Sequence, residues 1–313
     1  MSSRVRLHDR SSVSPVGNTA ARRSRAIRRH LTGWLFIGPA VIVYVAFVVY
    51  PLFYSILLSF YQWAGFQPRW GPFVGLQNYG LLARDPIFWK ALTNNILFVV
   101  LRTPFEVGIA LLLALLLNER FPGRLAFRTL IFVPVVLSLI VVGVVFGRIF
   151  EPTAGVLNTF LRLIGLGSLA LPWLGDAGLA LPAVTAVSIW KNVGFSMVIL
   201  LAGLQSTPPD VLDAARVDGA GAVRTALNVT IPILRPVIAI TVALSVISSL
   251  KVFDLVYIMT SGGPLYSTEV LTTYLYRVTF VYNQVGVGSS VAVVLMLLIL
   301  GISMVQLRVM RDE

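Results

Sequence analysis

The side chains that could perform covalent or metal chemistry are few in this sequence, and they are widely scattered. There is no Cys, which excludes thiolate catalysis, disulfides and Cys-based metal sites. The only two His, His8 and His30, lie before the first long apolar segment, so no His-based triad or zinc site can form within the apolar segments. We therefore expect no catalytic residue, no metal ligand and no cofactor-binding residue.

The chain is not expected to hydrolyse ATP itself, because the sequence has no P-loop. That motif, G-x-x-x-x-G-K-[ST], holds phosphates with backbone N–H groups and one Lys. The three Lys, at positions 90, 191 and 251, are followed by Ala, Asn and Val, so none fits the motif. Energy for any work done by this chain must come from a partner or from an ion gradient.

The composition explains why so little chemistry is present. The chain is 57% hydrophobic and 12% charged, with a mean hydropathy of +0.85, whereas soluble domains hold about 25% charged residues. Several apolar runs of about twenty residues are long enough to cross a bilayer. We predict an all-α membrane protein with six transmembrane helices, at about 31–60, 91–117, 129–150, 181–204, 237–260 and 285–307.

Prolines and glycines give the expected interruptions of these spans. Pro39 and Pro51 are expected to kink the first span or to mark its ends. The segment 151–181 is expected to lie outside the membrane and to contain a short amphipathic piece. Ser261-Gly262-Gly263-Pro264 is expected to break the fifth span, after which the chain returns outside.

Carboxylates inside the spans are too few for an ion relay. A secondary ion-coupled transporter, which is the alternative function, should show several of them. Glu106 and Asp254 are the only two, and each has a basic neighbour at helical spacing. Arg102 lies four residues before Glu106, and Lys251 lies three before Asp254. These spacings predict two ion pairs, each on one helix face.

The distribution of Lys and Arg predicts the orientation of the chain. The proposed inner segments hold sixteen of the 25 basic residues, eight of them in residues 1–30, and the outer segments hold five. This excess predicts that both termini are cytoplasmic. We read residues 1–30 as a disordered basic tail that contacts anionic lipid of the bilayer, with no nucleic-acid partner, and residues 31–313 as the transmembrane domain.

The stretch 206–236, between the fourth and fifth spans, is too polar to cross a bilayer. Pro208 and Pro209 should stop the preceding helix, and Asp210 can cap a new one. Asp218-Gly219 should break that helix, because Gly reaches the left-handed conformation at little cost. A second short helix is expected over about 220–230, ended by Pro232. The pattern predicts a helix, turn and helix at the membrane surface; the alternative is a surface helix that only joins two spans.

This stretch resembles the EAA loop of permease subunits of binding-protein-dependent ABC importers. In that family the loop forms the coupling helix that docks into a cleft on the ATPase subunit. The family's usual Glu is Asp213 here, and Leu227 stands where the family has Phe. The resemblance implies a coupling role for Asp213, Ala214, Ala215, Asp218, Gly219, Ala220 and Pro232.

Other stretches extend the resemblance over nearly the whole chain from Trp34. The segment LKVFDLVYIMTSGGPLYSTEVLTTYLY resembles carbohydrate permeases, above all the first permease subunit of maltose and glycerol 3-phosphate importers. The resemblance implies the type I permease fold, with a cytoplasmic coupling helix, in the cytoplasmic (inner) membrane of a prokaryote. It implies a second, different permease, two ATPase subunits that bind ATP and Mg, and an extracytoplasmic substrate-binding protein. The solute would be a sugar, such as an oligosaccharide, or a glycerol phosphate or phosphodiester, moved by alternating access.

A sugar path needs polar groups and aromatic faces near the middle of the membrane. Gapless alignment with the maltose permease picks Lys191, Asn192 and Phe195 on the fourth span, and Ser245, Ser248, Ser249 and Val252 on the fifth. The alternative is structural, because Ser in a membrane helix often bonds its own helix or lets helices pack. Lys191 could serve an anionic substrate, or it could extend to the outer interface.

Overall fold

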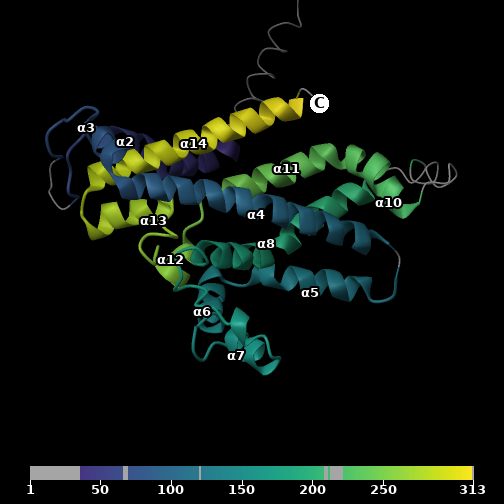
Figure 1. Ribbon diagram of the computed structural model, residues 1–313. Coiled ribbons are helices and arrows are strands. Elements are labelled where there is room, and N and C mark those ends of the chain that lie inside the picture. The colour runs from purple at the N-terminus through teal and green to yellow at the C-terminus, as the bar shows by residue number, and fades with distance from the viewer. Residues whose placement is uncertain (1–35, 66–69, 120, 208–210, 212–220, 312–313) are drawn as a thin grey trace, which may run out of the picture. The chain divides into compact units, whose positions relative to one another are not determined.

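The computed structural model describes residues 36–65, 70–119, 121–207, 211 and 221–311 (Figure 1). The described residues are almost entirely helical, and their only strand-like pairing is an isolated bridge between Tyr61 and Phe73. The chain divides into two units, residues 1–54 and residues 55–313, and each is considered by itself. The predicted tail, residues 1–30, lies outside the described residues.

The first span is one helix from Phe36 to Leu58, and neither proline ends it. Its middle is the π-helical stretch η1 (Val45–Val49), which leads directly into α2 (Tyr50–Leu58). A proline has no N–H group, and its ring crowds the carbonyl four residues earlier. The wider π turn before Pro51 is where such a residue can be accommodated without stopping the helix.

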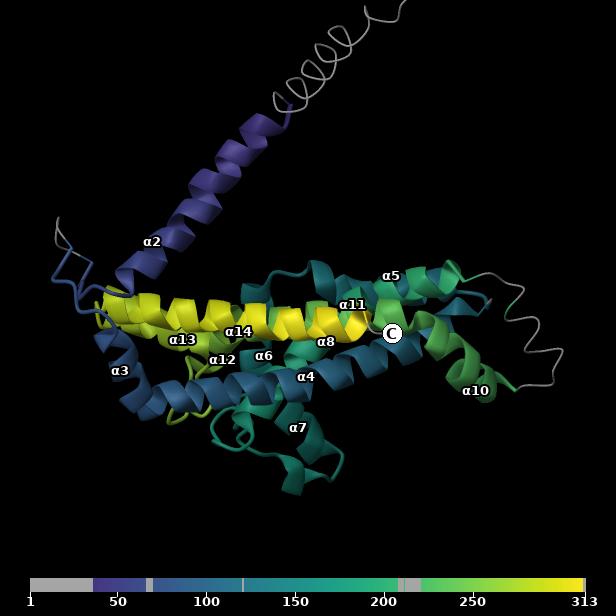
Figure 2. The same cartoon turned by 90° about the horizontal axis from the view of Figure 1, so that it is seen from above.

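Four long helices form the centre of the second unit, and they run side by side in both views (Figures 1 and 2). They are α4 (Pro86–Asn118), α8 (Ala180–Gln205), α11 (Ile231–Leu250) and α14 (Val285–Arg311). Helix α4 packs along both α8 and α11, and α11 also contacts α14. The core between α4, α8 and α11 is made of small and aliphatic side chains: Ala110, Ala114, Leu117, Met197, Leu200, Leu201, Leu204 and Leu234.

Shorter helices close the two sides of this layer. Helices α3 (Gln77–Arg84) and α13 (Leu271–Tyr276) join α4 and α14 in one apolar cluster. Helix α12 (Asp254–Thr260) joins α4, α6 (Leu139–Ile149) and α8 in another. The predicted amphipathic piece outside the spans is α7 (Val156–Leu163). Five helices of the described residues are long and apolar enough to cross a membrane, and a bent pair makes up to six.

The predicted third span, at about residues 129–150, is a bent pair of helices. The chain forms α5 (Arg124–Val136) and α6 (Leu139–Ile149) there, and the two helices meet at 96°. Leu137 and Ser138 are extended between them. Pro134 cannot bond the carbonyl four residues earlier, which weakens the last turn of α5, and the sequence continues apolar, so hydropathy alone hides the break.

The second and fifth spans also have other limits than predicted. Helix α4 begins at Pro86 because Asp85 caps it, accepting a hydrogen bond from Ile87 N at 2.8 Å. The fifth span ends at Leu250 and does not reach residue 260. Asn95 Nδ2 of α4 bonds the carbonyl oxygens of Ser249 and Leu250 at 3.5 and 3.3 Å, and so occupies the final acceptors of α11.

The predicted break after α12 is confirmed. Ser261 takes a left-handed conformation with φ 49°, Gly262 follows with φ 84°, and the Gly263–Pro264 peptide is cis. The loop then leads through α13 and the π-helical stretch η4 (Arg277–Val281) into α14, the sixth predicted span.

Candidate functional site

A buried ion pair lies at the centre of the described helices. Arg102 Nε donates to Glu106 Oε2 at 2.7 Å, and the two residues are only 3% and 2% exposed. Both belong to α4, four residues apart, where side chains share one helix face. The predicted pairing of Arg102 with Glu106 is confirmed.

Two neighbouring helices, α8 and α11, form hydrogen bonds with this pair. Ser196 Oγ of α8 donates to Glu106 Oε1 at 2.7 Å, and Ser245 Oγ of α11 donates to Glu106 Oε2 at 3.3 Å. Arg102 Nη1 donates to Ser249 Oγ of α11 at 3.2 Å. The carboxylate therefore has partners on both oxygens, as a charge in an apolar interior requires. The network ties α4, α8 and α11 together where they pack.

The second predicted ion pair is absent. Lys251 follows the last residue of α11, and Asp254 is the first residue of α12, so the two do not share a helix face. No ion pair joins them among the residues that the structure describes. The spacing rule fails here because it assumes a continuous helix.

The predicted path residues of the fifth span separate into two groups. Ser245 and Ser249 are buried and face α4 through the bonds above. Ser248 is exposed, and its hydroxyl donates to Ser245 O of its own helix at 3.0 Å. Val252 lies beyond the end of α11 and packs against the apolar cluster of α4, α6, α8 and α12.

The predicted path residues of the fourth span differ strongly in exposure. Phe195 is 45% exposed, and Asn192 is half-buried with its amide bonded to Ser188 O at 2.8 Å. Lys191 is only 6% exposed, and its Nζ donates to Val135 O at 3.2 Å. Val135 lies in the last turn of α5, so this lysine meets a carbonyl that the end of the helix leaves without a partner.

Helix α8 approaches the backbone of α5 very closely beside Lys191. A Cβ added to Gly194 would lie 2.3 Å from Ile131 O, so only glycine fits there. Helix α6 is held in a similar way, because a Cβ on Gly143 would lie 2.9 Å from the side chain of Ile258 in α12. The bent pair α5–α6 is therefore fixed by close contacts on both sides of its break.

Two consecutive amides of α4 were missed by sequence reasoning. Asn95 bonds the end of α11, and its Oδ1 also accepts from Leu271 N at 2.9 Å. Asn94 Nδ2 bonds the carbonyl oxygens of Tyr266 and Glu269 at 3.2 and 2.9 Å. Both are buried, and their only signal in the sequence is a pair of carboxamides inside an otherwise apolar helix.

A second ion pair fastens the loop that follows α12. Arg277 Nη2 donates to Glu269 Oε2 at 2.7 Å and to Ser261 O at 2.9 Å. Burial raises the pKa of the Glu269 carboxyl, and the neighbouring guanidinium of Arg277 opposes that shift. Gly262 is required beside it, because a Cβ there would overlap the Glu269 carboxylate.

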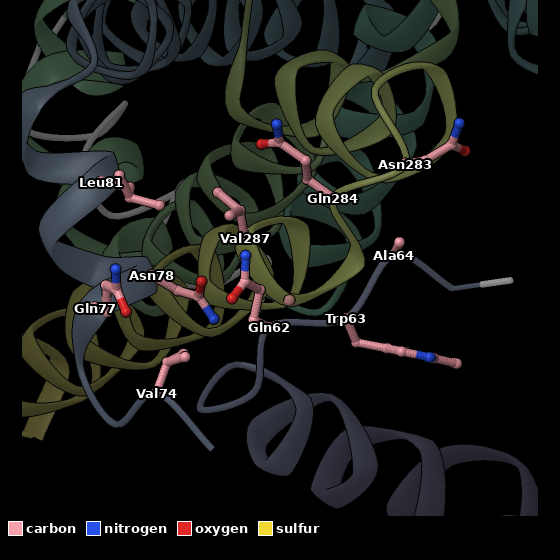
Figure 3. Close-up of a pocket in the computed structure, with 11 residues that line it drawn as sticks. Gln62, Trp63, Ala64, Val74, Gln77, Asn78, Leu81, Asn283, Gln284 and Val287 are labelled. Carbon is pink, nitrogen blue, oxygen red and sulfur yellow. The ribbon is translucent and has the colours of Figure 1, made fainter. Parts of the chain in front are cut away.

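A cavity of about 220 Å³ lies where the connection before α3 meets the start of α14 (Figure 3). Its polar lining is rich in carboxamides, and those of Gln62 and Asn78 lie beside Val287. Asn78 Nδ2 is already bonded to Ser59 O and Tyr61 O at 2.8 and 3.0 Å. None of the residues predicted for the substrate path lines this cavity.

Most of the predicted coupling residues lie outside the described residues. This holds for six of the seven predicted coupling residues: Asp213, Ala214, Ala215, Asp218, Gly219 and Ala220. The seventh, Pro232, is near the start of α11 and does not end a helix as predicted. Residues 222–250 form one continuous helix through α10 (Ala222–Thr225), η3 (Ala226–Thr230) and α11. The π turn η3 ends two residues before Pro232, as η1 does before Pro51.

Comparison with known proteins gives one consistent picture. Residues 106–310 match the family model described as binding-protein-dependent transport system inner membrane component. The probable ABC transporter permease protein YurN of Bacillus subtilis (strain 168) is 36% identical over 277 residues, covering 88% of this chain and 94% of the relative. The lactose transport system permease protein LacF of Rhizobium radiobacter is 34% identical over 301 residues, covering 94% and 99%.

A solved structure has the same fold. It is the crystal structure of a bacterial ABC transporter involved in the import of the acidic polysaccharide alginate, and one of its chains matches with a TM-score of 0.81. The identity is 24%, and the match covers 93% of this chain and 99% of that chain.

Proposed function

The chain belongs to the family of binding-protein-dependent transport system inner membrane components, and from that membership we infer that it is the transmembrane permease subunit of an ABC importer for a sugar-type solute. The observation that carries this inference is the family match over residues 106–310, which runs from the middle of α4 through α14. The chain is a transport subunit of the membrane and is not itself an enzyme.

We propose the following assembly and orientation. The chain pairs with a second, different permease, two ATPase subunits bind ATP and Mg, and an extracytoplasmic binding protein delivers the solute. Both termini are cytoplasmic, which the excess of basic residues in the inner segments supports. The lack of a P-loop in this sequence supports a separate ATPase.

We propose that the segment around Asp213 and Gly219 docks on an ATPase subunit. Movement there passes directly into the bilayer, because the continuous helix 222–250 leads from that segment to the buried end of α11. At its far end this helix bonds Arg102 and Glu106 through Ser249 and Ser245. A displacement of the segment therefore acts on a helix that is fastened to α4.

We propose that the solute passes along the exposed side of α8 and α11. Phe195 offers an aromatic face there, and polar groups come from Asn192, which is half-buried, and Ser248, which is exposed. Ser245 and Ser249 are buried beneath this surface, where both form hydrogen bonds with the ion pair of α4. Val252 supports the turn after α11 by packing against its neighbours.

Reconstitution in vesicles tests this function. The complete complex with its binding protein should take up a sugar only when ATP is supplied, and uptake should stop when hydrolysis is blocked with vanadate. Ionophores that collapse ion gradients should leave uptake intact. Uptake that needs no ATP and is abolished by ionophores would instead favour an ion-coupled transporter.

A further inference from the structure

We propose that Lys191 forms a binding site for the anionic group of an acidic solute, such as a carboxylated, sulfonated or phosphorylated sugar. The proposal rests on the function inferred above and narrows the class of substrate. It is carried by the burial of Lys191, by its few partners and by the charges of the neighbouring buried groups.

The side chain of Lys191 is almost completely enclosed, and it has few partners. The residue is 6% exposed, and its one hydrogen bond among the described residues goes to Val135 O at 3.2 Å. An ammonium group has three donors, so two donors remain for a ligand. A cation within a membrane span is costly unless it faces a cavity or a partner.

The neighbouring buried charges do not neutralise Lys191. Glu106 is the nearest candidate on the adjoining α4, but it accepts from Arg102, Ser196 and Ser245. No carboxylate of the described chain lies within ion-pair distance of Lys191. The charges of Arg102, Glu106 and Lys191 therefore sum to one excess positive charge.

The end of α5 compensates part of this charge. The carbonyl ends of a helix carry about half a negative charge, and Lys191 bonds one of them. About half a positive charge is then left on α8 one helical turn before Phe195, which we assign to the solute path. An anionic group on the solute would neutralise it, whereas a neutral sugar would leave it without a partner.

The chain contains no Cys, which allows the local electrostatic potential to be measured directly. Phe195→Cys places the only thiol of this chain one helical turn from Lys191. Its modification by an anionic, an uncharged or a cationic methanethiosulfonate is followed on this chain in the assembled complex. The matched backgrounds are Lys191→Met, which keeps the length and removes the charge, and Lys191→Arg, which keeps the charge.

We expect the ratio of anionic to uncharged reaction rates to fall in Lys191→Met by between about twofold and thirtyfold, for a separation of about 8 Å and effective dielectric constants of about 80 and 20. Lys191→Arg should preserve the ratio. An unchanged ratio in Lys191→Met overturns the proposal. A measurement with Lys191 intact does not depend on whether the Lys191→Met variant folds. In that background the anionic reagent should react faster than the cationic one, after correction for their reactivity with a free thiol. The reverse order would also overturn the proposal.

The substrate itself gives a second test, using a panel of neutral sugars and their carboxylated counterparts. The binding protein is screened first by thermal shift, and the sugars that it binds are used for ATP-dependent uptake. We expect the binding protein to bind acidic sugars, and we expect their uptake to be about tenfold or more lower in Lys191→Met than in the wild type. Binding and uptake of neutral sugars alone would overturn the anionic site and leave the sugar importer standing. A complex that binds and moves no sugar of either kind would overturn both.

Discussion

Replacing Glu106 with Gln tests how strongly the helices depend on the buried ion pair. Gln keeps the shape of the side chain and can still accept a hydrogen bond from Ser196, but it removes the negative charge beside Arg102. Breaking a buried pair in this way costs about 3–5 kcal/mol, because the remaining charge is left without a counter-charge. An unfolding entropy of about 2.1 cal/mol/K for each residue gives about 1.5 °C for each kcal/mol in a chain of 313 residues, so the melting temperature should fall by about 5–8 °C.

The assay is thermal unfolding of the purified complex in detergent, followed by the loss of the monodisperse peak in gel filtration. The double variant Arg102→Leu/Glu106→Leu should recover most of the loss, since both charges are then absent. Thr129→Ala is the matched control, because this exposed hydroxyl only bonds its own helix, at Leu125 O, and its removal should change stability little. Wild-type melting of Glu106→Gln, or a double variant no better than the single, would refute the reasoning.

Three further predictions concern packing, coupling and pH. Gly194→Ala should lower the melting temperature and the yield of complex, because its Cβ would lie 2.3 Å from a backbone oxygen of α5, whereas Gly108→Ala, which has open space, should not. Asp213→Ala should slow substrate-stimulated ATP hydrolysis about tenfold or more, as expected for a lost charged hydrogen bond of about 1.5–3 kcal/mol. Gly219→Val should abolish both the stimulated hydrolysis and solute uptake in reconstituted vesicles. Wild-type rates in either variant would mean that its residue has only a structural role. Hydrogen bonds from the backbone of the next turn lower the pKa of Glu151, so the stability that they add is present above its ordinary pKa of 4.5 and is lost as the pH falls below it. The melting temperature of the wild type should therefore approach that of Glu151→Gln in acid. A difference between the two proteins that stays constant with pH would contradict this.

The sequence predicts best those features that depend on neighbours along one helix. The pairing of Arg102 with Glu106 follows from a spacing of four residues, and the limits of α8 follow from its apolar run between polar segments. The family resemblance likewise identified the fold and the transport function. These predictions succeed because each rests on local geometry or on a long pattern of residues.

Features that depend on contacts between distant segments could not be predicted. The end of α11 depends on Asn95, which is more than 150 residues away in the sequence, and without it Lys251 and Asp254 looked like a helical pair. The bend after Val136 is held by Lys191, which lies 56 residues from its partner Val135. Hydropathy does not report such bonds, so it could give neither the break in the third span nor the early end of the fifth.

The position of Arg102 and Glu106 on one rigid helix has an electrical consequence. Moving one elementary charge across the whole bilayer against 100 mV costs about 2.3 kcal/mol, but a rigid shift of α4 moves equal and opposite charges together. The membrane potential therefore does almost no net work on this pair, however far the helix moves. A charge centre of this kind can fasten three helices through every stage of a transport cycle without making that cycle sensitive to voltage.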